Sequence, residues 1–405
     1  HGHCTALFPQ RRRVSEVNTE GAAPPPPGAE FIDSLERVNA SEWDAVAGSD
    51  YPFLQHRFLY GMETTACTTA DTGWQPCHLL LRRGAKLVGL LPLYLKAHSY
   101  GEYVFDWSWA DAWQRSGLEY YPKLVSAVPF TPATGPRLCV ADGEDAANLW
   151  PAARAAIEQF ASARGLSSWH LLFPDEDTSN RLLAAGLPQR MTTQFHWFNA
   201  NYHSFDDFLA EFASRKRKNL RRERERVAQQ GLSLQLLRGA EISPADWQQF
   251  HRFYQTTYAR RSGHGGYLTR DFFLQTAPSL GEQAIMVVAR HSGQAVAAAL
   301  YFRSSTTLYG RYWGCSADFD CLHFEACYYQ GIEYCIAEGL QRFDPGAQGE
   351  HKIQRGFQPV HTYSNHWIAD PRLAEAVADF TRRERPHIEA YREDAASLLP
   401  FRRES

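Results

Sequence analysis

A weak repeat between the two halves of the chain constrains the fold more than any other feature of the sequence. In each half, short apolar segments separated by turns are followed by a helix, a short strand and a closing segment that ends in Trp. The matching segments are 77–83, 87–96, 100–107, 152–164, 168–173 and 194–197 in the first half, and 284–290, 295–303, 307–313, 323–338, 342–344 and 364–367 in the second. Self-similarity in a fixed order is typical of duplicated units. The sequence therefore predicts two tandem copies of one unit.

Each copy opens with three segments that we interpret as antiparallel strands, because they are apolar and joined by short turns. The long helix of each copy ends at Gly-Leu, at 165–166 and 339–340, where Gly suits the left-handed position that ends a helix. Helices are also expected before the strands, at 41–47, 55–65, 244–260 and 270–277. The predicted fold class is α/β, with a mixed, mainly antiparallel sheet flanked by helices in each copy.

A chain of 405 residues has room for two domains of ordinary size. We predict a disordered N-terminal tail over residues 1–30, which contains four consecutive prolines, and a first domain over 31–200. A second domain is predicted over 201–370 and a C-terminal helical segment over 371–405. The reactive site is expected in the second domain.

The composition favours a globular protein without a uniformly basic surface, since 44% of the residues are hydrophobic and the net charge is −3. No apolar run reaches the roughly 20 residues that a membrane helix needs. The eight cysteines lack the paired spacing of a zinc site, so no metal is expected. We predict a cytoplasmic protein with reduced thiols. There is no dinucleotide fingerprint and no Walker loop, which argues against nicotinamide and ATP chemistry.

Three segments of the second half resemble a known family. They read YGRYWGC at 309–315, LHFEACYYQGIEYCI at 322–336 and PGAQGEHKIQRGF at 345–357. On these residues the chain is similar to the FemAB-like group of N-acyltransferases in the GNAT superfamily, whose domains show the element order described above. A weaker similarity extends the match to most of residues 31–390.

The resemblance implies transfer of an acyl or aminoacyl group to an amine acceptor, which would be a peptide, an amino sugar or a peptidoglycan-precursor-like molecule. It implies acyl-CoA or aminoacyl-tRNA as the donor, and it places the lysine that assists catalysis in Fem-type relatives near Lys352. The sequence departs from the GNAT pattern at one point, because the pyrophosphate-binding loop is absent between Trp313 and Leu322.

The strongest catalytic candidates lie in a Gly-containing segment that ends at Gly356. Acyl transfer needs groups that stabilise an oxyanion and a group that removes a proton. We assign Lys352 and Arg355 to oxyanion or phosphate stabilisation, and His351 or Glu350 to proton transfer. The alternative is a solvated salt bridge in a loop.

Further catalytic candidates are His323 and Glu325, in the first turn of the long helix, where free backbone N–H groups favour an anion. The alternative for Glu325 is an acid that complements the helix dipole. Tyr328 follows helical apolar spacing and is interpreted as a core residue. The substrate-binding candidates lie on a strand of the second half and a loop of the first, and they are Arg311, Tyr312, Trp313, Tyr121 and Lys123.

One stretch, 215–226, is strongly basic, and the apolar positions Leu220 and Val227 predict an amphipathic helix with a basic outer face. Such a face could bind tRNA, a nucleotide-linked acceptor, an acyl carrier protein or an anionic lipid headgroup. A plain solvated face is the alternative. The candidate phosphate-binding residues are Arg215, Arg217, Lys218 and Arg221.

The leading hypothesis is therefore an N-acyltransferase or aminoacyltransferase. The alternative is a non-catalytic binding module for a phosphate-bearing cell-wall precursor or a nucleic acid, which the missing pyrophosphate loop keeps open.

Overall fold

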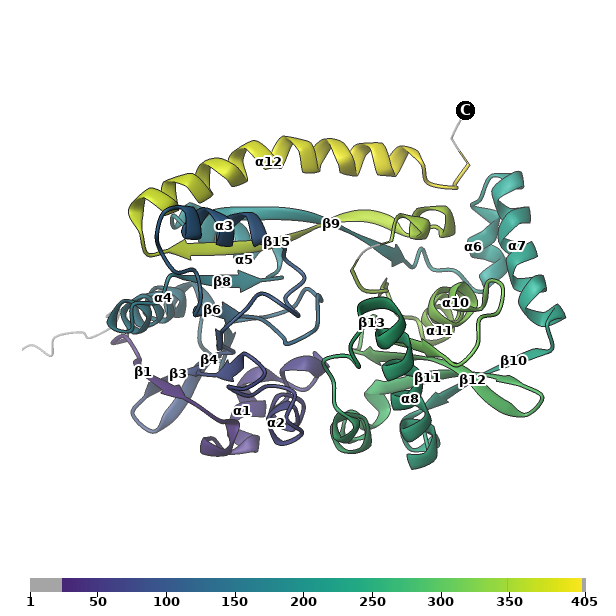
Figure 1. The fold of residues 1–405 in the computed structure, drawn as a ribbon, viewed down its shortest axis with the longest axis horizontal. Helices are drawn as coiled ribbons and strands as arrows, with labels where there is room; N and C mark the ends of the chain where they lie inside the picture. Colours follow the sequence, from purple (N-terminus) through teal and green to yellow (C-terminus); the bar gives the residue numbers. More distant parts are fainter. Residues whose placement is uncertain (1–23, 348, 403–405) are drawn as a thin grey trace, which may run out of the picture.

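The computed structural model describes residues 24–347 and 349–402, which form a mixed α/β fold on two sheets (Figure 1). The larger sheet has eleven strands in the order β10-β11-β12-β13-β14-β9-β15-β8-β6-β5-β2. The smaller has four, in the order β1-β3-β4-β7. Strands from both halves of the chain belong to the larger sheet. The mixed pairing and the flanking helices confirm the predicted fold class of two tandem GNAT-like units.

The second half follows the predicted element order. Its antiparallel strands are β10 (Leu232–Arg238), β11 (Ala284–His291), β12 (Gln294–Arg303) and β13 (Thr307–Cys315). The long helix consists of α10 (Leu322–Phe324), a π-helical turn (Glu325–Tyr329) and α11 (Gln330–Glu338). It leads to β14 (Arg342–Asp344), which pairs parallel to β13. The preceding helix α8 (Pro244–Ser262) begins at a capping box formed by Ser243 and Asp246.

The first half differs from the prediction in two segments. The single strand predicted at 87–96 is divided at Pro92 into two strands, at 86–91 in the small sheet and at 94–96 in the large one, because proline cannot donate to a strand ladder. β3 (His78–Arg83) and β4 (Lys86–Leu91) form a hairpin as expected. Residues 100–107, predicted as a strand, instead form a loop that leads into α3 (Trp107–Arg115). In this loop Glu102 and Asp106 turn inward and pair with Lys123. Because buried carboxylates need a cationic partner, this pairing shapes the segment more than its apolar alternation does.

The remaining elements of the first half complete both sheets and cover them with helices. β1 (Gly28–Ile32) and β7 (Cys139–Val140) lie in the small sheet, and β2 (Trp74–Pro76), β5 (Tyr94–Lys96), β6 (Lys123–Ser126) and β8 (Ser168–Leu172) lie in the large one. The main helices are α1 (Ala40–Ala47), α2 (His56–Thr64), α4 (Ala146–Ala163) and α5 (Glu176–Ala184).

The two halves exchange their closing strands. β9 (Gln189–Phe198) ends the first half, yet it pairs with β14 of the second half and, on its other edge, with β15. β15 (Gln358–Ile368) ends the second half, yet it pairs with β8 of the first. Each half therefore supplies a strand that extends the other half's part of the sheet. The boundary near residue 200 stays a prediction, because the sheet runs through both halves without a break.

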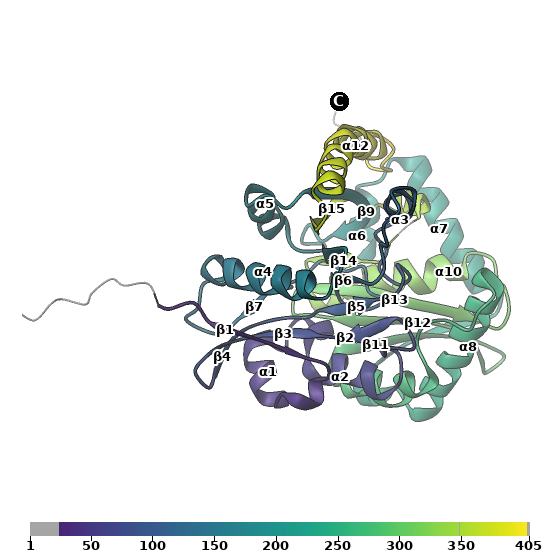
Figure 2. The same cartoon turned by 60° about the vertical axis from the view of Figure 1, so that its left-hand side comes forward.

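The C-terminal helix α12 (Pro371–Ser397) lies across β9 and β15 (Figures 1 and 2). An ion pair between Arg190 of β9 and Glu384 of α12, at 3.0 Å, ties the helix to the sheet. Beside the C-terminal end of α12, at the right of Figure 1, lie α6 (Phe205–Ala210) and α7 (Ser214–Gln229). Most of the predicted tail, residues 1–23, lies outside the described residues. Its last part differs from the prediction, because residues 28–30 belong to β1.

The largest apolar cluster contains residues of both halves and joins them. The ring of Phe53 packs against those of Phe302 and Tyr309, with a centroid distance of 5.2 Å to Tyr309. Within the described part of the chain, no helix combines the length and apolar character needed to span a membrane.

Candidate active site

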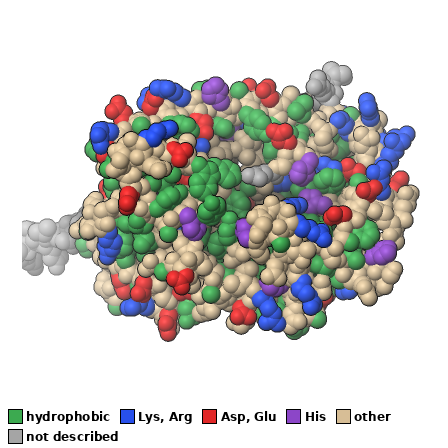
Figure 3. Space-filling model, in the orientation of Figure 1, with side chains coloured by type: hydrophobic (Ala, Val, Ile, Leu, Met, Phe, Trp, Pro, Cys, Tyr) green, Lys and Arg blue, Asp and Glu red, His purple; other side chains and the backbone are tan. Residues whose placement is uncertain are grey.

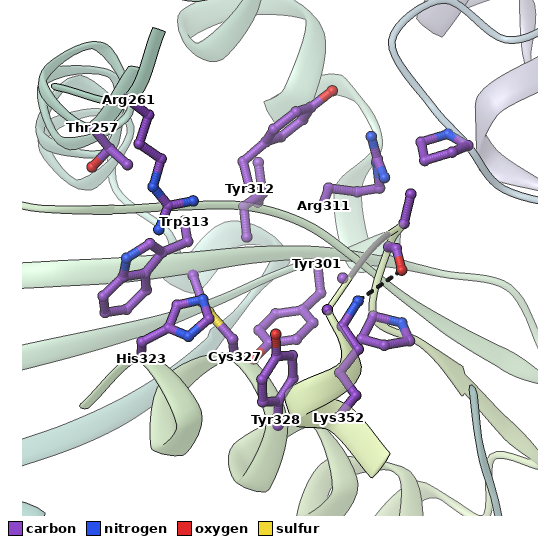
Figure 4. A pocket seen from close by; sticks show the side chains of 18 of the residues that line it. Thr257, Arg261, Tyr301, Arg311, Tyr312, Trp313, His323, Cys327, Tyr328 and Lys352 are labelled. Carbon is purple, nitrogen blue, oxygen red and sulfur yellow. Dashed lines mark hydrogen bonds between the residues drawn. The ribbon is translucent and has the colours of Figure 1, made fainter. Parts of the chain in front are cut away.

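A cavity opens where two parallel strands of the second half diverge. β13 and β14 are paired from Thr307 opposite Arg342 to Tyr309 opposite Asp344. β13 then continues to Cys315, whereas the chain after Asp344 leaves the sheet. The space between them forms a cavity of about 580 Å³, which Tyr103 and Pro132 of the first half help to enclose (Figure 4). Both halves therefore contribute to its walls.

Arg311 lies on the β13 wall of the cavity. The register between β12 and β13 shifts after Leu300, which pairs with Tyr312, so that Arg311 has no opposite residue. A bulge of this kind bends a strand and redirects a side chain. The Arg311 guanidinium donates to the carbonyl oxygen of Phe130, in the first half, at 2.6 Å. The bulge thus connects the cavity wall of the second half to a loop of the first.

Lys352 lies in the opposite wall, on the 3-10 helix Glu350–Arg355. This helix follows Gly349, whose φ of 107° lies in the left-handed region and where a Cβ atom would stand 2.6 Å from the His351 ring. Lys352 is 2% exposed, and its Nζ donates to the carbonyl oxygen of Gly346 at 2.9 Å. Burial lowers the pKa of Lys352 to about 8, although the charge of Asp344 opposes the shift.

Two histidines and a tyrosine lie beside this lysine. Nε2 of His351 and the Tyr328 hydroxyl form a hydrogen bond of 2.8 Å. The His323 ring packs edge-on against Trp313, with a centroid distance of 5.3 Å. Burial and the charge of Lys352 lower the pKa of His351 to about 4, and burial with the nearby His351 lowers that of His323 to about 3. Both rings are therefore neutral at pH 7.

The cavity is cationic. Arg261 of α8, Arg311 and Lys352 line it, and no carboxylate occurs among the described residues of its wall. Figure 4 shows Arg261 reaching toward Trp313 and His323 from one end, with Arg311 and Lys352 at the other. Such a lining favours an anionic substrate group or an oxyanion that develops during a reaction.

The structure brings six of the predicted site residues to this cavity, namely Arg311, Tyr312, Trp313, His323, His351 and Lys352. Arg355 lies behind it, where it donates to Glu223 at 2.8 Å and to the carbonyl oxygen of His351 at 2.7 Å. Glu350 accepts a hydrogen bond from Tyr391 of α12. Glu325 is buried and pairs with Arg224 at 2.7 Å. These three side chains hold the surrounding elements in place.

Tyr121 and Lys123 lie in a buried polar cluster of the first half. Lys123 Nζ donates to Asp106 at 2.6 Å and to Glu102 at 2.8 Å. The Tyr121 hydroxyl is hydrogen-bonded to Ser99 at 2.6 Å. Burial alone would lower the pKa of Lys123, but the two carboxylates outweigh it and the pKa is raised. Neither side chain lines the cavity.

The predicted phosphate-binding residues lie on α7. Figure 3 shows blue side chains gathered at the upper right, over this helix. Arg221 pairs with Asp206 at 3.3 Å. Within the described part of the chain, Arg215, Arg217 and Lys218 have no acidic partner within ion-pair distance. The helix therefore presents a cationic surface that is separate from the cavity.

Tyr328 and Arg261 line the cavity but are not candidates from the sequence. Tyr328 has the spacing of a core residue in a regular helix. It lies in the π-helical turn Glu325–Tyr329, whose extra residue changes which side chains face the cavity. Arg261 lies in the last turn of α8, where a basic residue is normally interpreted as stabilising the helix dipole. Tyr328 is buried in an apolar cluster of the second half, as predicted, and the sequence carries no signal that it also lines the cavity.

Comparison with known proteins places this fold in context. A FemAB-like family model, described as peptidoglycan biosynthesis/recognition, matches residues 34–403. The crystal structure of FemX is similar over 86% of this chain and 100% of its own, with a TM-score of 0.51 and 12% identity. The C-terminal domain of an Agrobacterium fabrum protein, provisionally named a lysylphosphatidylglycerol synthetase, covers 86% of this chain and 96% of its own, with a TM-score of 0.51 and 11% identity. No curated protein matches the sequence.

Proposed function

The chain belongs to the FemAB-like family, and from that premise we propose that it is a transferase that forms an amide bond between an acyl or aminoacyl group and an amine acceptor. The observation that carries the proposal is the cationic cavity between β13 and β14, with the Lys352 ammonium buried in its wall. The proposed acceptor is a peptide, an amino sugar or a peptidoglycan-precursor-like amine. The proposed donor is acyl-CoA or aminoacyl-tRNA, and the cytoplasmic location stays a prediction.

In the proposed reaction the acceptor nitrogen attacks the carbonyl carbon of a donor ester or thioester. A C–N bond forms while the carbonyl oxygen takes up negative charge. The C–O or C–S bond of the donor then breaks and the leaving group departs. The Lys352 ammonium donates a charge-assisted hydrogen bond to the oxyanion, in a site from which burial excludes most water.

The attacking nitrogen must also lose a proton. The Tyr328 hydroxyl can accept this proton while passing its own to Nε2 of His351, which lies 2.8 Å away. Because the pKa of His351 is lowered to about 4, the ring is neutral and free to accept a proton, and it readily releases it to the leaving group. Arg355 keeps this ring in place through its bond to the His351 carbonyl oxygen.

The test is a transfer assay with the full chain. Acetyl-CoA, longer acyl-CoAs and aminoacyl-tRNA are each combined with nucleotide-linked peptidoglycan precursors and with simple amines, and amide products are measured by mass spectrometry. We expect turnover with one donor class, and a loss of at least ~100-fold in kcat/KM for Lys352→Ala. Lys86→Ala is the control, because Lys86 is exposed on β4.

A second function is favoured by one observation, the cations Arg215, Arg217 and Lys218 of α7, for which residues 24–347 and 349–402 offer no acidic partner. If no donor supports turnover, the transferase proposal is wrong and the chain is a binding module. In that case a phosphate-bearing precursor or a nucleic acid should still bind, and Arg217→Glu should weaken the binding more than Lys352→Ala does.

A further inference from the structure

A chain of buried polar contacts lies behind Lys352 and crosses into the exchanged strand of the first half. The Lys352 ammonium donates to the carbonyl oxygen of Gly346, and the Gly346 N–H donates to Oδ1 of Asp344, each at 2.9 Å. Nε2 of His196, on β9, lies 3.5 Å from the same carboxylate oxygen. The side chains of Asp344 and His196 are each about 3% exposed.

The neighbours of His196 fix where its proton sits. The amide nitrogen of Gln194 donates to the carbonyl oxygen of Pro132 at 2.9 Å, so its amide oxygen faces Nε2 of His196, at 3.0 Å. Both neighbours of Nε2 are therefore acceptors, and Nε2 must carry the hydrogen. Pro132 itself lines the cavity. The contacts thus begin at one cavity wall, run through β9 and end at the lysine in the opposite wall.

We propose that His196 and Gln194 are positioning residues for Lys352, acting through Asp344 and the Gly346 peptide. The strand that carries them belongs by sequence to the first half, so the exchange of β9 makes that half a part of the reactive site. The role assigned to Lys352 rests on the proposed function. The contacts that link β9 to Lys352 are the same whichever acyl donor the protein uses.

The pKa of Lys352 makes the link between His196 and Lys352 measurable, because few groups act on it. Asp344 is the carboxylate whose charge acts on Lys352, and the Cys327 thiol and the His351 ring also face it. Burial keeps His196 neutral by lowering its pKa to about 4, so that it acts as a hydrogen-bond donor and adds no second cation. Burial raises the pKa of Cys327, which therefore stays a thiol. The charge state of Lys352 thus depends mainly on its burial and on Asp344.

The experiment measures how readily acetic anhydride labels Lys352 in the native full chain as a function of pH. The unfolded chain is then fully labelled with deuterated acetic anhydride and digested with trypsin, and the ratio of the two labels is read in the peptide 343–355. Lys352 is the only lysine in that peptide. The half-point of native labelling should lie at about 8 in the unmodified protein.

Asp344→Asn should lower this half-point by about one pKa unit, because it removes the attracting charge and leaves the burial. His196→Leu should raise it by about one unit toward the ordinary lysine value, because the carboxylate that holds the Gly346 N–H loses its polar neighbour, the loop loosens and water reaches the ammonium. His196→Gln, which retains an N–H donor, should restore the original half-point. His170→Leu is the matched control, since His170 is an equally buried histidine of the large sheet, 1% exposed, on β8.

A purely structural role for His196 predicts that His196→Leu and His170→Leu lower the melting temperature alike and leave the Lys352 half-point at about 8. Either that result or an unchanged half-point in Asp344→Asn would overturn the inference. If His196→Leu does not fold, Gln194→Leu tests the same contact. Labelling needs no substrate, so a panel without turnover overturns the proposed function alone. Where a donor is found, His196→Leu should lower kcat about tenfold with KM within about twofold.

Discussion

The two halves of this chain share one element order but use their parallel strand pair differently. In the second half β13 and β14 diverge around an open cavity. In the first half β6 pairs parallel to β8, and the space beyond them is filled. Arg137 occupies it and donates to the carbonyl oxygens of Leu172, at 2.8 Å, and Ala133, at 2.9 Å. The two copies of a duplicated fold can thus differ at the same place, with the strand pair of one closed by a buried side chain and that of the other open to a cavity.

The buried lysines of the two halves show the same contrast. Lys123 has two carboxylates within 2.8 Å, which raise its pKa despite its burial. Lys352 has a carbonyl oxygen as its nearest partner, and its pKa is lowered to about 8. The two carboxylates hold Lys123 in its charged form within the core. The ammonium of Lys352 lies in the cavity wall, where it can donate a hydrogen bond to a bound molecule. Burial alone therefore does not fix the pKa of a lysine; its partners decide the direction in which the pKa shifts.

The largest expected effect comes from replacing each lysine by methionine. Lys352→Met should abolish turnover, by more than ~100-fold, and change the free energy of unfolding by no more than ~1 kcal/mol. Lys123→Met should cost ~3–5 kcal/mol, because it leaves Glu102 and Asp106 buried without their closest cation. Urea denaturation and steady-state kinetics measure both. Equal losses in the free energy of unfolding for Lys352→Met and Lys123→Met would contradict the proposed contrast between the two lysines.

The next effect concerns pH. If the ammonium form of Lys352 stabilises the oxyanion, activity is present below its pKa and lost as pH rises through about 8. We expect kcat/KM to fall about tenfold per pH unit above that value. Lys352→Arg should remove this alkaline limb from the measurable range, because arginine stays charged. A profile that instead rises through about 8 would assign the neutral amine, acting as a base, to Lys352.

A smaller effect should distinguish Arg137 from Arg311, which both donate to carbonyl oxygens of the first half. Arg137→Met should cost ~2 kcal/mol or more of stability, because it removes the hydrogen bonds that the buried guanidinium donates to the carbonyl oxygens of Leu172, Pro136 and Ala133, and should not change KM. Arg311→Met should raise KM about tenfold, because its guanidinium lines the cavity, and should cost less stability than Arg137→Met, because only the bond to the Phe130 carbonyl is lost and the Tyr312 hydroxyl still donates to that oxygen at 3.4 Å. Denaturation and kinetics on both variants test this division. A raised KM in Arg137→Met would mean that the filled half also binds substrate.

The smallest effect concerns α7. Arg215→Glu combined with Lys218→Glu should raise KM for a phosphate-bearing donor a few-fold at low salt and leave stability within ~0.5 kcal/mol. Arg382→Glu combined with Arg383→Glu, on the exposed face of α12, is the control of equal charge change. KM of the unmodified protein should rise with salt concentration, and KM of the α7 variant should change less. Equal effects of the two variants would indicate a general attraction and no binding surface on α7.

The sequence was sufficient to predict the fold class, because apolar alternation and helix-ending glycines are local signals that the duplication repeats. The loop at residues 100–107 was not predictable in this way. Its conformation depends on Lys123, which lies far enough along the chain that no local pattern connects them. The exchange of β9 and β15 was equally hidden, because strand order in a sheet depends on pairing between distant segments.

Within the site, the sequence indicated the segment around Lys352 and the strand that bears Arg311. It could not separate residues that line the cavity from residues that support it. Glu325 has the chemistry of a proton acceptor, yet Arg224 engages it, and its role becomes clear only when that partner is known. Tyr328 shows the opposite case, because it is a core residue, as predicted, and its place in a π-helical turn also brings it to the cavity.

The exchange of β9 and β15 also bears on how the chain reaches this structure during its synthesis. A ribosome that has released residues through 200 has delivered β9, but neither β14 nor β15, the strands on its two sides. Until Ile368 emerges, β8 has β6 on one edge but lacks β15 on the other, and this open edge can pair with other chains. A nascent chain interrupted between the halves is therefore left with unpaired strands, and the first half matures only after the second has been made.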